Sequence, residues 1–215
     1  HEHIDVMQKD AGTARRQVDS LQEQMCSTLD EAIAALNEEL VSILAKLNSP
    51  AFADTSLPPT ETLDRLKDIS LRLRAAERSF EQSMEYESQF RDNVYSDREP
   101  LDEALQVFAY REELWTRVAD WQEAEESWLS AEFVSLDVQS IQETVVDYLK
   151  AAHGLYKRYN EPLVLDVLKK SAERYQQWMP TLFDMGNPAM LPSHWAIVFE
   201  HLGVPVPSQF SLRDL

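Results

Sequence analysis

The 215 residues suffice for one large or two small packed units, and an apolar content of 44% excludes a disordered chain. No apolar stretch reaches the length that a bilayer-spanning helix needs. The formal net charge of −18 disfavours nucleic acids and acidic lipid surfaces as partners, because these carry charge of the same sign.

The first predicted helix covers about residues 4–47 and ends at Asn48-Ser49-Pro50. Its apolar residues recur at intervals of three and four, as they do on one face of a helix. They are Ile4, Met7, Ala11, Ala14, Val18, Leu21 and Met25, followed after a slip of one residue by Leu29, Ile33, Leu36, Leu40, Ile43 and Leu47. We interpret the slip as a reset of the same face without a break in the helix. An alternative stays open, in which the first stripe is partly an exposed coiled-coil face.

A second helix is predicted over about residues 60–95 and a third over about residues 101–133, joined by a short turn. The third helix carries large apolar residues seven apart, which places them along one face. They are Val107, Leu114, Trp121 and Trp128, with Leu101, Phe108 and Trp115 beside them. Long helices with short connections predict an elongated antiparallel three-helix bundle over residues 1–134, with the tryptophans in its core rather than on a docking surface.

A second, shorter helical subdomain is predicted over residues 135–215, so that the whole chain is expected to be all-α. Asp137 should cap a fourth helix, and Asn160-Glu161-Pro162 should open a fifth. A sixth helix is predicted over about residues 193–202, before a glycine and two prolines. Ser211 has the position of a cap for a further helix that is cut off, so we expect the chain to be part of a longer protein.

Two residues near the end of the fifth predicted helix can interrupt or end it. Pro180 lies inside the apolar repeat and should kink or end the helix, because its ring clashes with the preceding turn. Gly186 follows and can close the helix in the left-handed conformation. Together they predict that this helix stops shortly before residue 187.

Residues that could carry chemistry are scattered. The four glycines are too dispersed to form a phosphate-binding loop, and His194 and His201 lie too far apart along one helix to share a metal. The acidic run at residues 123–126 is expected on a solvated face rather than as an acid–base pair.

Cys26, the only cysteine, permits no internal disulfide and favours a reducing, intracellular setting, where we expect it to be a buried and inert thiol. We therefore predict no catalytic residue, no metal and no cofactor in this segment.

From Leu114 onward, short motifs follow in a set order. They are Leu114-Trp115 with Trp121 and Trp128-Leu129, then Leu136-Asp137, Leu155-Tyr156-Lys157, Met179-Pro180, Asn187-Pro188-Ala189-Met190, Ser193-His194-Trp195, Leu202-Gly203 and Phe210-Ser211-Leu212. In this order they resemble the N-terminal part of the linker region of dynein heavy chains. The residues Asn187-Pro188-Ala189-Met190 are more similar to the motif of axonemal dyneins than to that of the cytoplasmic form. Ser193 departs from the family pattern, which usually has arginine there. The resemblance implies structural rather than catalytic roles for Trp115, Trp121, Trp128, Pro180, Asn187, Pro188, His194 and Trp195.

The resemblance implies a mechanical function. In the family, the linker is a rod of helical bundles that lies across a ring of AAA+ modules and swings as the ring hydrolyses ATP. This segment would then be a force-transmitting lever without catalysis of its own, while ATP and Mg belong to the parent motor. The implied partners are the AAA+ ring of the same heavy chain, the dynein tail with its associated chains and, indirectly, the microtubule, with neither nucleic acid nor membrane. The implied location is the cytoskeleton of a cilium or flagellum, in the axoneme.

Two other interpretations stay open. A spectrin-like rod or scaffold that binds other proteins suits the first three helices equally well. Such an array repeats at a fixed period, however, and residues 137–215 do not repeat residues 1–133. A helical enzyme is disfavoured, because no nucleophile, base and orienting group occur together in the sequence.

Overall fold

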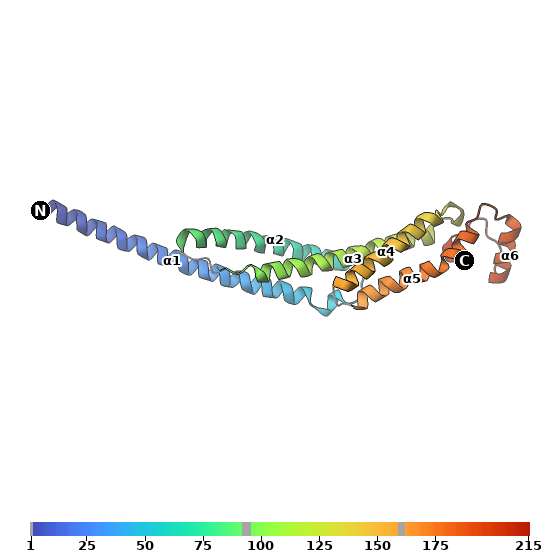
Figure 1. Ribbon diagram of the computed structural model, residues 1–215, viewed down its shortest axis with the longest axis horizontal. Coiled ribbons are helices and arrows are strands. Elements are labelled where there is room, and N and C mark those ends of the chain that lie inside the picture. Colours follow the sequence, from blue (N-terminus) through green and yellow to red (C-terminus); the bar gives the residue numbers. More distant parts are fainter. Residues whose placement is uncertain (1, 92–95, 159–161) are drawn as a thin grey trace. The chain divides into compact units, whose positions relative to one another are not determined.

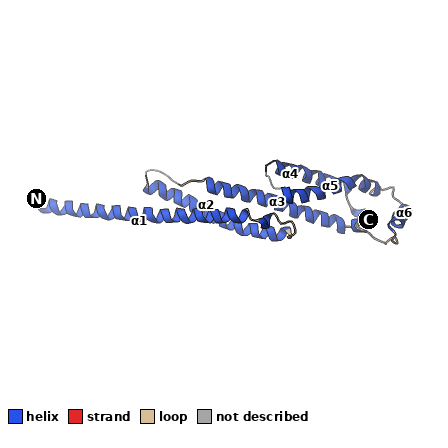
Figure 2. Ribbon diagram, turned by 90° about the horizontal axis from the view of Figure 1, so that it is seen from below, coloured by secondary structure: helices blue, strands red, loops and turns tan. Residues whose placement is uncertain are grey.

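The computed structural model describes residues 2–91, 96–158 and 162–215, and the side chains of residues 2–11, 162 and 163 lie outside this description. The described residues form helices joined by turns and loops, with one isolated bridge between Glu132 and Ser211 (Figure 1, Figure 2). Its α-helices are α1 (Glu2–Leu47), α2 (Pro59–Phe90), α3 (Glu99–Ser130), α4 (Val138–Arg158), α5 (Pro162–Met185) and α6 (Pro192–Leu202), with 3₁₀ turns at Pro50–Phe52, Phe133–Ser135 and Leu212–Asp214. The predicted all-α fold is confirmed. Within the described residues, no helix combines the length and the apolar character that crossing a membrane requires.

Most helix ends follow the local signals in the sequence. Asp137 precedes α4 as predicted, and its Oδ1 accepts the backbone N–H of Ser140 at 3.1 Å. α6 ends at Gly203, whose φ of 73° is the left-handed conformation that glycine adopts without strain. The predicted opening of the fifth helix at Asn160 and its neighbour, and the predicted end of the second at Tyr95, lie outside the described residues.

The prediction that the fifth helix stops shortly before residue 187 is confirmed, since α5 ends at Met185. Of the two outcomes predicted for Pro180, an end of the helix does not occur there, and a kink stays a prediction; the residue lies on the exposed side of α5. Gly186 does not have a positive φ, so the prediction of a left-handed closure there is wrong. A Cβ atom at Gly186 would lie 3.0 Å from the carbonyl oxygen of Leu182 and 3.0 Å from a methyl group of Val138. Glycine is therefore required for close packing of the end of α5 against the start of α4.

The chain divides into two compact units within α3. The first unit comprises residues 1–52 and 64–111, and the second comprises residues 53–63 and 112–215. One helix thus supplies its first part to one unit and its second part to the other. The domain boundary at residues 134 and 135, placed at the end of the third long helix, stays a prediction.

In the first unit, α1 and α2 run antiparallel and differ in length, with 46 and 32 residues (Figure 1). The first part of α1 extends beyond the end of α2 in both views. The end of α2 meets α1 near Gln22, whose side-chain amide donates to the carbonyl oxygen of Phe90 at 3.2 Å. Val18 and Leu21 are 60% and 59% exposed. The buried face of α1 begins at Leu29, close to where the apolar repeat slips by one residue. The prediction of a helix without a break is confirmed, and its apolar face is buried only from Leu29 onward. Residues 14–25 are exposed, as the alternative expected, while a coiled-coil contact of this face stays a prediction.

A network of charged groups determines where α2 meets α1. The carboxylate of Glu87 is fully buried and accepts hydrogen bonds from Arg91 at 3.3 Å and from the backbone N–H of Ser96 at 3.0 Å. Arg91 also donates to the carbonyl oxygen of Cys26 at 3.2 Å and to the carboxylate of Asp30. Removal of one member would leave a buried charge uncompensated, so the network holds this register of the two helices. The expectation of a fully buried thiol at Cys26 is wrong, since its side chain is only partly buried.

Candidate functional site

The second unit is organised around Trp121 of α3, which is 2% exposed. Its indole N–H donates to the hydroxyl oxygen of Ser171 in α5 at 3.1 Å. Its ring lies edge-on to the rings of Trp128, Tyr148 and Tyr175, with centroid distances of 5.7, 5.1 and 5.7 Å. Edge-to-face contacts of this kind stabilise aromatic pairs beyond the burial of their area. One indole therefore links α3, α4 and α5.

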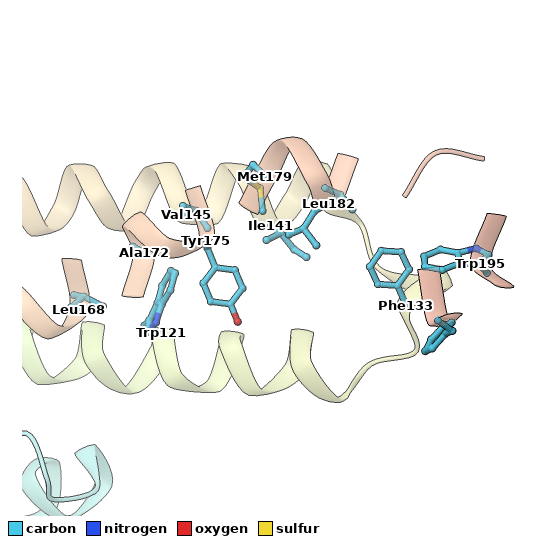
Figure 3. Close-up of a cluster of buried hydrophobic side chains, with 12 residues drawn as sticks. Trp121, Phe133, Ile141, Val145, Leu168, Ala172, Tyr175, Met179, Leu182 and Trp195 are labelled. Atoms are coloured by element: carbon cyan, nitrogen blue, oxygen red, sulfur yellow. The ribbon is translucent and has the colours of Figure 1, made fainter. Parts of the chain in front are cut away.

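Aliphatic side chains of α4 and α5 complete this core (Figure 3). They recur at intervals of three and four along each helix, as the sequence predicted, and each is at most 6% exposed. They are Ile141 and Val145 of α4 with Leu168, Ala172, Met179 and Leu182 of α5. Such interiors are packed as densely as organic crystals and resist compression.

Tyr175 has the most perturbed environment of this core. Its ring is 1% exposed and also lies 5.4 Å from that of Trp128, so it contacts Trp121 and Trp128 of α3. Burial, followed by the nearby carboxylate of Glu125, raises the pKa of the Tyr175 hydroxyl well above its ordinary value. The phenol is thus held in its neutral form.

Tyr175→Phe is expected to reduce the loss of stability at alkaline pH. The folded chain keeps the phenolic proton above pH 10, while the unfolded chain loses it, so this group's contribution to the free energy of unfolding is full below pH 10 and falls as the pH rises. The fall is at most about 1.4 kcal/mol per pH unit. Urea unfolding at pH 9 and pH 11 measures the free energy of unfolding of the native chain and of the variant. Tyr148, whose pKa is also raised by burial, is present in both proteins, so its contribution cancels in the comparison. Equal pH dependence of the two proteins would contradict the expectation.

A second group of rings, the terminal aromatic cluster, consists of Phe133, Trp195, Phe199 and Phe210. Phe210 stands at its centre, with ring centroids 5.7 Å from Phe133, 4.6 Å from Trp195 and 5.1 Å from Phe199. The backbone N–H of Phe133 donates to the carbonyl oxygen of Phe210 at 2.8 Å. The last residues of the chain are thereby fastened to the end of α3 and to α6.

The loop between α5 and α6 is held by local hydrogen bonds. Asn187 Oδ1 accepts the backbone N–H of Ala189 at 2.9 Å, which forms an Asx turn. His194 Nδ1 accepts the backbone N–H of Leu191 at 3.1 Å and so satisfies a donor at the start of α6. Both side chains are exposed, and both act on the backbone of their own loop.

The structure separates the residues of the sequence motifs into two groups. Trp115, Trp121 and Trp195 are buried, at 1%, 2% and 9% exposure, and Trp128 is half-buried against the core. The others lie on the surface, and they are Pro180, Asn187, Pro188 and His194. The sequence motifs did not single out Phe133, Tyr175 or Phe199.

Charged groups around this core form surface ion pairs. Arg174 lies 3.3 Å from Glu125, and Arg213 pairs with Glu126, so that two carboxylates of the acidic run face arginines. Such exposed pairs contribute about 1 kcal/mol or less. Within the described residues, no group of histidine, cysteine and carboxylate side chains is arranged to hold a metal ion. The property that this arrangement supplies is stiffness, because aromatic rings from several helices interlock.

Comparisons with known proteins identify relatives. Residues 101–215 match the family model of the dynein heavy chain, N-terminal region 2. The chain is similar to dynein axonemal heavy chain 6 of Homo sapiens, with 25% identity over 175 residues that cover 81% of this chain and 4% of that protein. It is also similar to the dynein-1-beta heavy chain, flagellar inner arm I1 complex, of Chlamydomonas reinhardtii, with 23% identity over 218 residues that cover 98% of this chain and 5% of that protein. No solved structure matches the chain with statistical significance.

The relatives are much longer than this chain. The family match covers α3 to α6 and the last residues of the chain, which include both aromatic groups. The chain itself spans 4% and 5% of these two relatives. The similarity therefore concerns one helical segment of much longer proteins.

Proposed function

The chain belongs to the dynein heavy chain family, and from this premise we propose that it is a force-transmitting segment of the linker, the lever of a microtubule-based motor. The resemblance to dynein heavy chains inferred from the sequence is confirmed by the match over residues 101–215. In this proposal the segment performs no catalytic step, and ATP and Mg are bound elsewhere in the parent motor. A spectrin-like rod without a motor is not carried further, because the match covers more than half of the chain.

The observation that carries the proposal is the interlocked core of the second unit. Trp121 contacts rings of both α4 and α5 and donates a hydrogen bond to Ser171. The terminal aromatic cluster joins α6 to the 3₁₀ turn that follows α3. A lever transmits force only if bending it requires more work than the load demands. Dense packing provides that resistance, since a packed interior transmits strain rather than absorbing it.

The proposed location and partners follow from the relatives. Two of them are named for the axoneme and for a flagellar inner arm, so we place this chain in the cytoskeleton of a cilium or flagellum. Its proposed partners are other parts of a dynein, namely the AAA+ ring of the same heavy chain, the tail and its associated chains. Contact with the microtubule is indirect, and the net charge of −18 disfavours nucleic acid and acidic membranes.

Removal of the Trp121 side chain from the core should slow movement along microtubules more than it slows ATP turnover. In the full heavy chain that carries this segment, Trp121→Ala is expected to slow microtubule gliding several-fold while most of the ATP turnover persists. Trp121→Phe, which keeps a ring against Tyr148 and Tyr175, should restore most of the gliding velocity. The two rates are measured on the same preparation.

The matched control is Trp178→Ala, because Trp178 lies on the surface of the same unit with 47% exposure. It should leave gliding and turnover unchanged. If Trp121→Ala lowered both rates by the same factor, or left gliding unchanged despite a softened core, the lever role would be wrong.

A further inference from the structure

The first unit has an apolar groove between α1 and α2, away from the residues used in the proposed function. It has a volume of about 830 Å³, and its lining among the described residues comes from these two helices. The buried Leu29 and Leu36 line it together with four small, exposed residues, which are Ala32, Ala35, Ala75 and Ser79. Leu21, Met25 and Tyr86 stand at one end and are 59%, 47% and 41% exposed. Contiguous apolar surface of this kind marks an interaction site more often than ordinary surface.

The groove continues into the exposed stripe at the start of α1. Val18, Leu21 and Met25 follow the same three-four spacing as Thr28, Ala32 and Ala35 of the groove. The spacing therefore continues along one side of α1, from the part of this helix that extends beyond the end of α2 (Figure 1) into the groove between the two helices. From residue 14 to residue 39 it measures about 38 Å at 1.5 Å per residue.

We propose that this groove docks one amphipathic α-helix of a partner protein, about 25 residues long, which lies along α1 and completes a four-helix packing in the first unit. The straight groove between two helices fits a third rod-shaped element, as in other helix-in-groove complexes. Because several side chains that line the groove are small, the occupant presents large aliphatic side chains at intervals of three and four residues. The inference is independent of the lever role, since it concerns a different unit.

The charges at the two edges of the groove specify the flanks of the occupant. On α1, Glu31 and Glu38 are exposed and lie one helical turn from the lining residues Thr28 and Ala35. On α2, the exposed Arg78 and Glu85 lie one turn from the lining residues Ala75 and Gln82, so this edge carries both signs of charge. The occupant therefore carries lysine or arginine on the flank towards α1, while its flank towards α2 can carry either sign. Between the edges, Arg72 and Glu39 already form an ion pair at 2.7 Å, so they do not demand a charge from the occupant.

A second copy of this chain fits the groove less well. It would bring the carboxylates of Glu31 and Glu38 towards those of the other copy, in chains that each carry a net charge of −18. The charge therefore favours a different helix.

The test uses the full chain and two labelled synthetic helices of about 25 residues, whose binding is followed by fluorescence anisotropy. The mixed helix has leucine along one stripe, lysine on one flank and glutamate on the other; the acidic helix has glutamate on both flanks. The chain should bind the mixed helix about threefold to fivefold more tightly than the acidic one. In the variant E31K/E38K this preference should disappear or reverse.

Two substitutions on one helix locate the binding site. Ala32→Glu places a carboxylate in the lining of the groove and should weaken binding of the mixed helix about tenfold or more, because the charge would be buried in the complex. Ala34→Glu places the same side chain on the exposed opposite face of α1 and should leave binding unchanged. Equal binding by both variants, or no binding of the mixed helix to the native chain, would overturn the proposal. Light scattering that shows a dimer of the native chain, dissociated by Ala32→Glu, would also overturn it and assign the groove to a second copy.

Discussion

Trp121→Ala is expected to lower the free energy of unfolding by about 3–5 kcal/mol, the range found when large aromatic residues are removed from a packed core. Trp121 is 2% exposed and contacts the rings of Trp128, Tyr148 and Tyr175. The substitution removes these contacts and leaves the hydroxyl of Ser171 without its indole partner. Urea unfolding followed by circular dichroism measures the difference.

The control for this change is Trp178→Ala, which removes the same side chain from the surface of the same unit. Trp178 is 47% exposed, with its ring 5.4 Å from that of Tyr175 and the guanidinium of Arg174 at 5.3 Å. Exposed contacts of this kind contribute about 1 kcal/mol. A similar loss for both variants would show that the core is not organised around Trp121.

Trp195→Ala is expected to have the second largest effect, a loss of about 3 kcal/mol. Trp195 is 9% exposed and lies 5.3 Å from Phe133 and 4.6 Å from Phe210, so its removal opens the terminal aromatic cluster. The last residues of the chain should then detach before the remainder of the unit unfolds, because they are fastened mainly through this cluster.

Hydrogen exchange distinguishes this local effect from a general loss of stability. The backbone N–H of Phe133, which donates to the carbonyl oxygen of Phe210, should exchange much faster in Trp195→Ala, while amides in the middle of α4 change less. Trp195→Phe keeps a ring in the cluster and should retain most of the protection. Unchanged exchange at Phe133 in the alanine variant would mean that Trp195 does not hold the chain end.

Several features of the fold were predictable because their causes are local. The three-four spacing of apolar residues indicates a helix wherever it occurs, and each long predicted helix is present in the described residues. Asp137 and Gly203 bound their helices through hydrogen bonding and backbone conformation that a few neighbouring residues define. His194 satisfies the start of α6 in the same local way.

Other features could not be inferred because they depend on residues distant in the sequence. The local signal at Gly186 is a glycine after a helix, which predicts a left-handed cap; the actual constraint is the methyl group of Val138, which packs 3.0 Å from where a Cβ would lie. Likewise, nothing near Phe133 indicates that it stacks on Phe210 with their planes 18° apart. The division of the chain within α3, rather than after it, also arises from contacts between helices.

Composition and periodicity predict a helical chain, because helix formation depends on short stretches of residues. The order of the motifs resembles dynein heavy chains, and the family match over residues 101–215 confirms that resemblance. Composition, periodicity and motif order do not reveal which stretch of an apolar stripe is buried. Val18 and Leu47 obey the same spacing, yet one is 60% exposed and the other is fully buried. The difference is set by the length of α2, because an apolar face enters the core only where a second helix lies against it, and that depends on where distant parts of the chain end.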